Sequence, residues 1–320
     1  MAAATSLLVG PAAAHAQRPD PLGFSIDAVG FPSFFIYDAK PGETVRGRVR
    51  VRNIAGESRV AYLRTVDAKT AATGGVEYGS QSRPPRGTGR WIRLGARTLN
   101  LPAGAAVEVP FTARVPRDAR RGDQLAGIVA FGKPPPPSRA RGGRFRLRFV
   151  SRLAIAVQFR LPGKREPRLE LRDAGVQVLP AGASLALRLA NTGNTLIPKT
   201  SGRVTVSTAG KTLFSRPVRL DSFVPKTELV YALPWLGRPV EGDYEVTGEI
   251  RPAGAKPIEV DTKVRFGKER IREFRKETGR PAVEAQGTSP LLIAFLGAII
   301  VALTVLAAAY LRLRRKVRVG

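Results

Sequence analysis

The stretch ETVRGRVRVRN (residues 43–53) alternates small or apolar residues with arginine. Successive side chains of a β-strand point to opposite faces, so Val45, Gly47, Val49 and Val51 would face a core while the intervening arginines face water. The alternation predicts a half-buried β-strand.

The same period of two recurs along the chain between Gly-, Pro- and Asn-containing breaks. It is found in AAVEVPFTARVP (105–116), RFRLRFVSRLAIAVQFRLPG (144–163), SLALRLANTG (184–193), GRVTVSTAG (202–210) and DYEVTGEIRPAG (243–254). Short strands at this spacing are typical of antiparallel sandwiches. We therefore expect an all-β chain with two immunoglobulin-like β-sandwich domains, followed by a single C-terminal transmembrane helix. The expected domain bounds are 22–162 and 167–267, with LPGKREP (161–167) as the hinge.

The transmembrane helix is expected at 290–311, a run without any charged residue. At ~1.5 Å per residue this run is about 33 Å long, enough to cross a hydrocarbon core of roughly 30 Å. A basic tail, 312–320, follows at once, and cations beside a span stay cytoplasmic. We expect a single-pass cell-membrane protein with its main domains outside. The segment 268–289 would be a juxtamembrane stalk that begins with a short helix in which Ile271 and Phe274 share a face.

The N-terminus resembles a secretory signal. Small residues precede a cleavage motif that ends at Ala16, which would leave Gln17 as the mature start and 1–16 as the signal peptide. The segment has no basic start and only a short apolar run. Two interpretations stay open: a signal truncated by a misassigned start codon, or an Ala-rich disordered terminus.

Composition excludes several kinds of catalytic site. The chain has no cysteine, and its one histidine, His15, lies in the segment expected to be removed. Cysteine nucleophiles, Ser-His-Asp hydrolysis, haem ligation and nearly all zinc sites need these residues. We expect no enzyme, no cofactor and no metal site; a Ser-Lys or carboxylate-pair mechanism is the alternative that composition leaves open.

The net charge of +28 favours anionic partners. Outside a membrane these are phosphate-bearing wall polymers, anionic glycans or lipid headgroups rather than nucleic acid. Arginine greatly exceeds lysine in the sequence, so an arginine-biased genome is an equally open explanation.

Two insertions interrupt the strand spacing of the first domain. GGVEYGSQSRPPRGTGR (74–90) is rich in Gly, Ser and Arg, and GKPPPPSRARGGR (132–144) combines four prolines with cations. Both are expected to be exposed loops, which either carry binding chemistry or are solvated connectors. The candidate wall-polymer contacts in or beside them are Arg83, Arg86, Arg90, Arg93, Arg139, Arg141 and Arg144.

The first domain resembles a known family over about residues 20–133. The resemblance rests on the order of Pro41-Gly42, Trp91, Pro102 to Gly104, Pro116, Gly122 and Gly127-Ile128-Val129. This order is similar to that of the WxL-interacting proteins of Gram-positive bacteria, and the high arginine content and polyproline loop suggest an actinobacterial-type member. The resemblance implies a peptidoglycan-binding first domain, a partner-binding second domain and a secreted WxL-type protein as partner. Read from its own position, Trp91 is expected to begin a strand and lie in the core.

The favoured hypothesis is therefore a non-enzymatic, membrane-anchored cell-surface protein. It would bind peptidoglycan or an anionic, teichoic-type wall polymer and scaffold another surface protein. The alternative is a tethered, chaperone-like docking platform that holds secreted subunits at an exposed strand edge.

Overall fold

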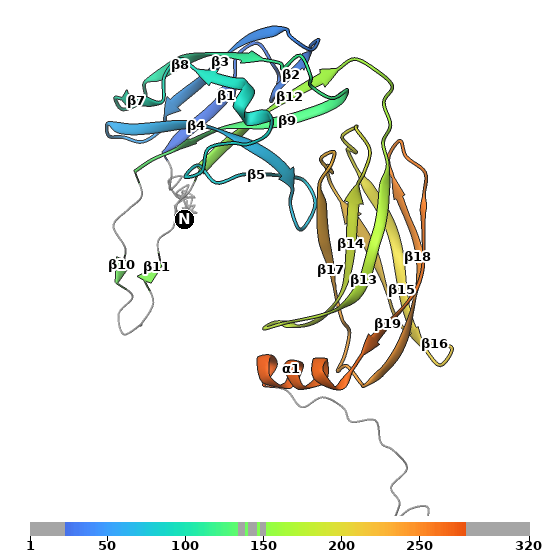
Figure 1. Ribbon diagram of the computed structural model, residues 1–320. Helices are drawn as coiled ribbons and strands as arrows, with labels where there is room; N and C mark the ends of the chain where they lie inside the picture. Colours follow the sequence, from blue (N-terminus) through green and yellow to red (C-terminus); the bar gives the residue numbers. More distant parts are fainter. Residues whose placement is uncertain (1–22, 134–137, 140–145, 148–151, 280–320) are drawn as a thin grey trace, which may run out of the picture.

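The computed structural model describes residues 23–133, 138–139, 146–147 and 152–279. Within them the protein is mostly β-structure, arranged as two sandwich-like units with a single short α-helix (Figure 1). The strands of the first sandwich lie between residues 24 and 161, and those of the second between 169 and 266. The all-β sandwich prediction is confirmed.

One sheet of the first sandwich has the strand order β1-β3-β8-β6. Its strands are β1 (Phe24–Ala28), β3 (Thr44–Asn53), β8 (Ala106–Arg114) and β6 (Ile92–Leu94). In β3 the predicted alternation holds, because Val49 and Val51 are fully buried and the arginines between them reach the surface. Position 47 requires glycine, because a Cβ there would lie 2.3 Å from Tyr37 Oη and 2.6 Å from Phe111 Cζ.

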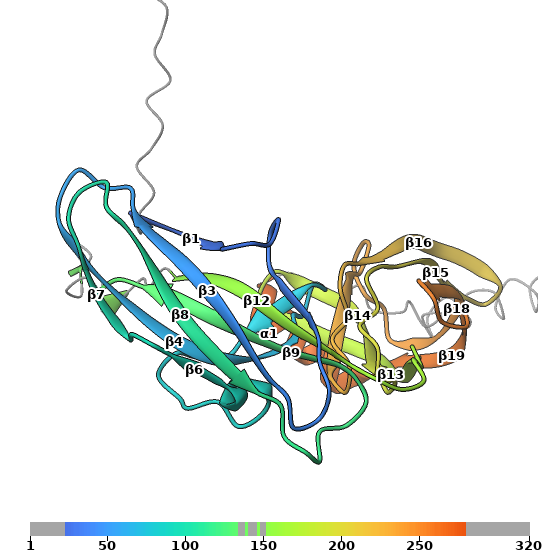
Figure 2. The same ribbon diagram turned by 90° about the horizontal axis from the view of Figure 1, so that it is seen from above.

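The facing sheet has the order β2-β12-β9-β4-β5, with β7 also paired to β4. Its strands are β2 (Phe35–Asp38), β12 (Arg152–Leu161), β9 (Gly122–Phe131), β4 (Arg59–Thr70), β5 (Val76–Tyr78) and β7 (Thr98–Leu101). The N-terminal segment changes sheets: β1 runs antiparallel to β3, and β2 runs parallel to β12. A further pair joins β10 (Ser138–Arg139) to β11 (Arg146–Leu147), so the polyproline insertion contains a short strand. Figure 2 shows the two sheets of this sandwich crossing when viewed from above.

The second sandwich packs a three-stranded sheet on a four-stranded one. The first sheet contains β13 (Leu169–Leu179), β14 (Gly182–Asn191) and β17 (Glu228–Pro234), and the second contains β16 (Lys211–Leu220), β15 (Thr200–Thr208), β18 (Gly242–Pro252) and β19 (Ile258–Phe266). Each sandwich has its own cluster of buried apolar side chains. Full burial of one such Leu, Val or Phe side chain contributes about 1.5–3 kcal/mol. Each unit therefore has its own core without a disulfide.

Helix α1 (Lys268–Thr278) follows β19 directly and ends at Gly279, which has a left-handed φ of 62°. Ile271 and Phe274 are buried in the core of the second sandwich. The first half of the expected stalk thus packs on this domain. In the part of the chain that the structure describes, no helix is long and apolar enough to cross a membrane. The expected signal (1–16, with Ala16 and Gln17), span (290–311) and tail (312–320) lie outside the described residues.

The two sandwiches meet at two places. At the tip of the β4–β5 hairpin, the hydroxyls of Thr70 and Thr227 lie 2.6 Å apart, and Val224 N donates to Thr70 Oγ1 at 2.8 Å. At the start of β9, Asp123 N donates to Asn194 O at 2.8 Å. Figure 1 shows the β5 hairpin reaching toward the second sandwich.

Candidate anion-binding groove

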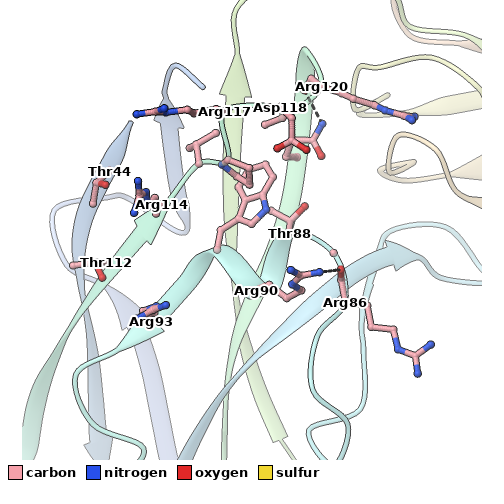
Figure 3. A pocket seen from close by; sticks show the side chains of 16 residues that line it. Thr44, Arg86, Thr88, Arg90, Arg93, Thr112, Arg114, Arg117, Asp118 and Arg120 are labelled. Atoms are coloured by element: carbon pink, nitrogen blue, oxygen red, sulfur yellow. Dashed lines mark hydrogen bonds between the residues drawn. The ribbon is translucent and has the colours of Figure 1, made fainter. Parts of the chain in front are cut away.

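A groove of about 1380 Å³ lies on the first sandwich, where the ends of β3, β6 and β8 meet two loops. Six arginines and one acidic residue contribute to its lining (Figure 3). The arginines are Arg86, Arg90, Arg93, Arg114, Arg117 and Arg120, and the acid is Asp118. The polar and aromatic lining also includes Trp91, Gln124 and three threonines (Thr44, Thr88, Thr112).

The loop that carries Arg86 and Arg90 is held by one carboxylate. Asp67 of β4 accepts hydrogen bonds from the backbone N–H groups of Arg86 (2.7 Å), Gly87 (2.9 Å) and Gly89 (2.8 Å). The 3₁₀ turn η1 (Thr88–Trp91) follows. Position 89 must be glycine, because a Cβ would lie 2.8 Å from the Val66 backbone. The loop is therefore a fixed element.

The remainder of this insertion lies over the outer face of a sheet. Arg152 of β12 donates through Nη2 to Tyr78 O at 2.5 Å and through Nη1 to Gln81 Oε1 at 3.1 Å. Gly127 leaves room for the Tyr78 ring, since a Cβ there would meet it at 2.4 Å. Burial raises the pKa of Tyr78 to about 12. The segment 74–90 is thus held against the domain, and Arg83, Arg86 and Arg90 on it are exposed, as predicted for this insertion.

Strands position the next two arginines. Arg93 of β6 pairs with Thr112 of β8, which pairs in turn with Arg46 of β3, so these residues form one row across the sheet. Thr44 and Arg114 form the neighbouring row. The alternation of β8 places Thr112 and Arg114 on the exposed face. One side of the groove is therefore a rigid sheet surface.

The opposite rim is the connection between β8 and β9. A turn closes with Ala119 N donating to Pro116 O at 3.2 Å, and Gln124 Nε2 donates to Arg120 O at 3.1 Å. Figure 3 shows Arg117 and Arg120 on this rim, with Arg114 and Arg93 on the strand side.

Within the described residues, the groove arginines have no anionic partner. Among the described residues, none of the six guanidinium groups forms an ion pair, and the hydrogen bond from Arg90 Nη1 to Arg86 O is 3.5 Å long. Elsewhere on the same sheet, Glu108 pairs with Arg50 at 2.7 Å and Arg48 at 3.4 Å. Since an anion binds best where positive charge is unneutralised, this groove is the strongest candidate for an anionic ligand.

The predicted contact residues fall into three groups. Arg86, Arg90 and Arg93 line the groove. Arg83 lies beside smaller hollows with Pro84 and Pro85 instead. Arg139 is in β10, away from the groove residues in sequence, and Arg141 and Arg144 lie outside the described residues.

Three groove arginines were missed by the sequence interpretation. Arg114, Arg117 and Arg120 belong to the short run RVPRDARR (114–121), whose density of cations between two strands was the available signal. Trp91 was also misplaced, because it ends η1 and is half-buried. Its ring packs on Phe159 at a centroid distance of 5.3 Å and contributes to the groove lining.

No cluster of acidic residues able to hold a metal ion occurs in the described ranges.

No model of a known protein family and no curated protein matches the sequence. Solved structures of pilus chaperones are similar in overall arrangement. The E. coli chaperone DraB has a TM-score of 0.36 at 12% identity, with 75% of this chain and 98% of that chain covered. The Salmonella enterica SafA pilin–SafB chaperone complex gives 0.35 at 13%, covering 76% and 98%. The Acinetobacter baumannii CsuC–CsuE chaperone–tip adhesion subunit complex gives 0.37 at 12%, covering 75% and 97%. Similarity at this level is too low to transfer a function or a partner to this chain.

Proposed function

We propose that this chain is a non-enzymatic cell-surface protein whose first sandwich binds an anionic polymer of the cell envelope. The observation that carries the proposal is the groove lined by six exposed arginines without an ion-pair partner in the described structure. Planar guanidinium groups form paired hydrogen bonds with phosphate and carboxylate groups. Several of them around one groove suit a ligand with repeated anionic groups.

The aromatic content of the groove favours a glycan-type polymer over nucleic acid. Proteins that bind single-stranded nucleic acid stack successive bases on several aromatic side chains. Trp91 is the one aromatic residue in the groove lining, and it is half-buried. Peptidoglycan, which the family resemblance implies, and teichoic-type polymers, which the net charge favours, offer carboxylate or phosphate groups to the arginines instead.

The proposal includes the membrane attachment. The apolar run 290–311 would span the bilayer with 312–320 inside, and the chain would enter the export pathway with cleavage between Ala16 and Gln17. A WxL-type secreted protein would be the partner of the second sandwich. These parts rest on the sequence.

A sedimentation assay with purified cell walls tests the polymer-binding proposal. The purified full chain in detergent should pellet with walls at low salt and be released as ionic strength rises, because exposed charges are screened. The variant R114A/R117A/R120A should stay in the supernatant. The matched control R203A/R219A/R238A removes three exposed arginines from the second sandwich and should pellet like the wild type. If the wild type does not pellet, wall binding is rejected.

A second candidate is the docking platform for secreted subunits, and one observation favours it. Strand β12 pairs with β9 along its whole length, but β2 covers its other edge only from Val157 to Arg160. Among the described strands, residues 152–156 thus have no partner on this edge, which leaves backbone groups available to an added strand. A photo-crosslinking residue in place of Ala154 should then capture an exported subunit in cells. Absence of any crosslink to an exported protein would reject this candidate.

A further inference from the structure

The rim of the groove continues directly into the contact between the two sandwiches. Arg117 and Arg120 lie on the connection 115–121, and Gln124, which closes this connection onto Arg120 O, also lines the groove. Gly122 and Asp123 lie between them and are both buried. The segment that carries two groove arginines is therefore attached at one end to β8 and at the other to the second sandwich.

Asp123 makes this attachment with both its backbone and its side chain. Its N–H donates to Asn194 O, and Oδ2 accepts from Leu196 N at 2.7 Å and from Arg165 Nη2 at 2.5 Å. The side chain is completely buried. One carboxylate thus joins β9, the interdomain linker and the second sandwich.

The neighbouring residues fit tightly. Gly122 has φ +98°, and a Cβ on it would lie 2.1 Å from Asn194 O. Asn194 itself holds the linker, since its Oδ1 accepts from Glu166 N at 2.7 Å and its Nδ2 donates to Lys164 O at 2.9 Å. The end of the rim therefore has little freedom to move while these contacts persist.

We propose that Asp123 is a positioning residue for the anionic ligand, because it fixes the Arg117–Arg120 rim of the groove against the second sandwich. The proposal rests on the polymer-binding function of the groove. In this arrangement the second sandwich contributes to binding without touching the polymer, and full affinity requires the intact contact between the domains. Any partner that shifts Asn194 or Leu196 would change the affinity of the groove.

The other interdomain contact supplies a matched control. Thr70 is also buried, and its hydroxyl also bonds across the interface, to Thr227 and Val224. It lies at the tip of the β4–β5 hairpin and does not line the groove. Thr70→Val thus weakens the interface while leaving the rim attached.

Electrostatics gives the test a clear sign. Asp123→Asn removes a negative charge close to the groove, so charge alone would leave polyanion affinity equal or higher. Loss of positioning would lower it, since Arg117 and Arg120 would no longer be held at the ligand. The two explanations therefore predict opposite changes.

The experiment measures the binding of inorganic polyphosphate to the purified full chain across a series of salt concentrations, together with thermal unfolding. For Asp123→Asn we expect an affinity about fivefold lower and a shallower dependence of log affinity on log salt, because fewer cations engage the ligand. Thr70→Val should lower the unfolding temperature but keep the wild-type affinity and salt dependence. Equal affinity in Asp123→Asn and wild type, or equal losses in Asp123→Asn and Thr70→Val, would overturn the positioning role.

Two further outcomes separate this inference from the proposal on which it rests. Failure of the wild type to bind polyphosphate or walls would reject the groove function itself. If Asp123→Asn does not fold, Gly122→Ala tests the same attachment by forcing Asn194 O away, and it should lower affinity without any change of charge. Wild-type affinity in a folded Gly122→Ala protein would reject the inference.

Discussion

The two ends of one sheet face in the first sandwich carry arginines in very different states. At one end, Arg48 and Arg50 of β3 flank Glu108 of β8, and both pair with it. At the other end, Arg93 and Arg114 lie on the same face without an ion-pair partner among the described residues and border the groove. The difference teaches that the count of arginines does not locate a binding site in this strongly basic chain. The positions of the few carboxylates locate it, because they determine which arginines have no ion-pair partner.

The largest expected effect is a loss of affinity that occurs on substitution at the groove end and not at the Glu108 end. Arg90→Ala, Arg114→Ala and Arg117→Ala combined should lower polyphosphate affinity roughly a thousandfold, since each charged hydrogen bond contributes about 1.5 kcal/mol. Arg48→Ala with Arg50→Ala should change it by less than about threefold, because both arginines already pair with Glu108. Titration calorimetry at low salt measures both, and similar losses in the two variants would remove the distinction.

The second-largest effect is expected from releasing the loop that Asp67 holds on the groove side. Asp67→Ala removes the acceptor of three backbone hydrogen bonds and should lower the free energy of unfolding by about 2 kcal/mol. Polyphosphate affinity should fall about tenfold as Arg86 and Arg90 lose their positions. Denaturant unfolding and calorimetry check the two quantities. As a control, Asp118→Ala removes an exposed acid from the groove lining and should tighten binding without altering stability.

A smaller effect is expected when Glu108, the acid that pairs with Arg48 and Arg50, loses its charge. The hydrogen bond from Arg50, together with the charges of Arg48 and Arg50, lowers the pKa of Glu108 below its usual range. Glu108 thus stabilises the fold above the ordinary carboxyl pKa, and this contribution is lost as pH falls through the lowered value. Glu108→Gln should free both arginines and raise polyphosphate affinity about threefold at neutral pH. An unchanged affinity in this variant would mean that the two arginines lie beyond reach of the ligand.

The smallest expected effect concerns the packing that supports the groove loop. Because burial raises the pKa of Tyr78 to about 12, its stabilising effect should be complete below the ordinary tyrosine pKa and be lost as pH rises toward about 12. Tyr78→Phe should remove this dependence. Ultraviolet titration of the phenolate, compared between wild type and variant, measures it. A Tyr78 pKa at the ordinary tyrosine value would contradict the packing on Gly127.

The fold was accessible from sequence because its signal is repeated and local. The alternation in β3 and β8 reports burial residue by residue, and the turns at Pro41-Gly42 and Pro102–Gly104 follow from backbone preferences. Such patterns need no knowledge of distant contacts.

The site was only partly accessible because it depends on contacts distant in sequence. Asp67 accepts hydrogen bonds from a loop about twenty residues further along the sequence. Arg152, which lies late in the sequence of the first sandwich, bonds to Tyr78 O in the same insertion. Neither partner is marked by a local pattern. Arg86, Arg90 and Arg93 were found because they are concentrated in one insertion, whereas Arg114, Arg117 and Arg120 reach the groove through strand pairing and a turn.

The two contacts between the sandwiches also fix the distance from the groove to the far end of the second sandwich. A single linker would let the domains rotate, but Asp123 and Thr70 hold two separate points, so the second sandwich acts as a spacer of constant length. Helix α1 lies at the end of that spacer away from the first sandwich (Figure 1). These two contacts therefore hold the groove at a constant distance from helix α1.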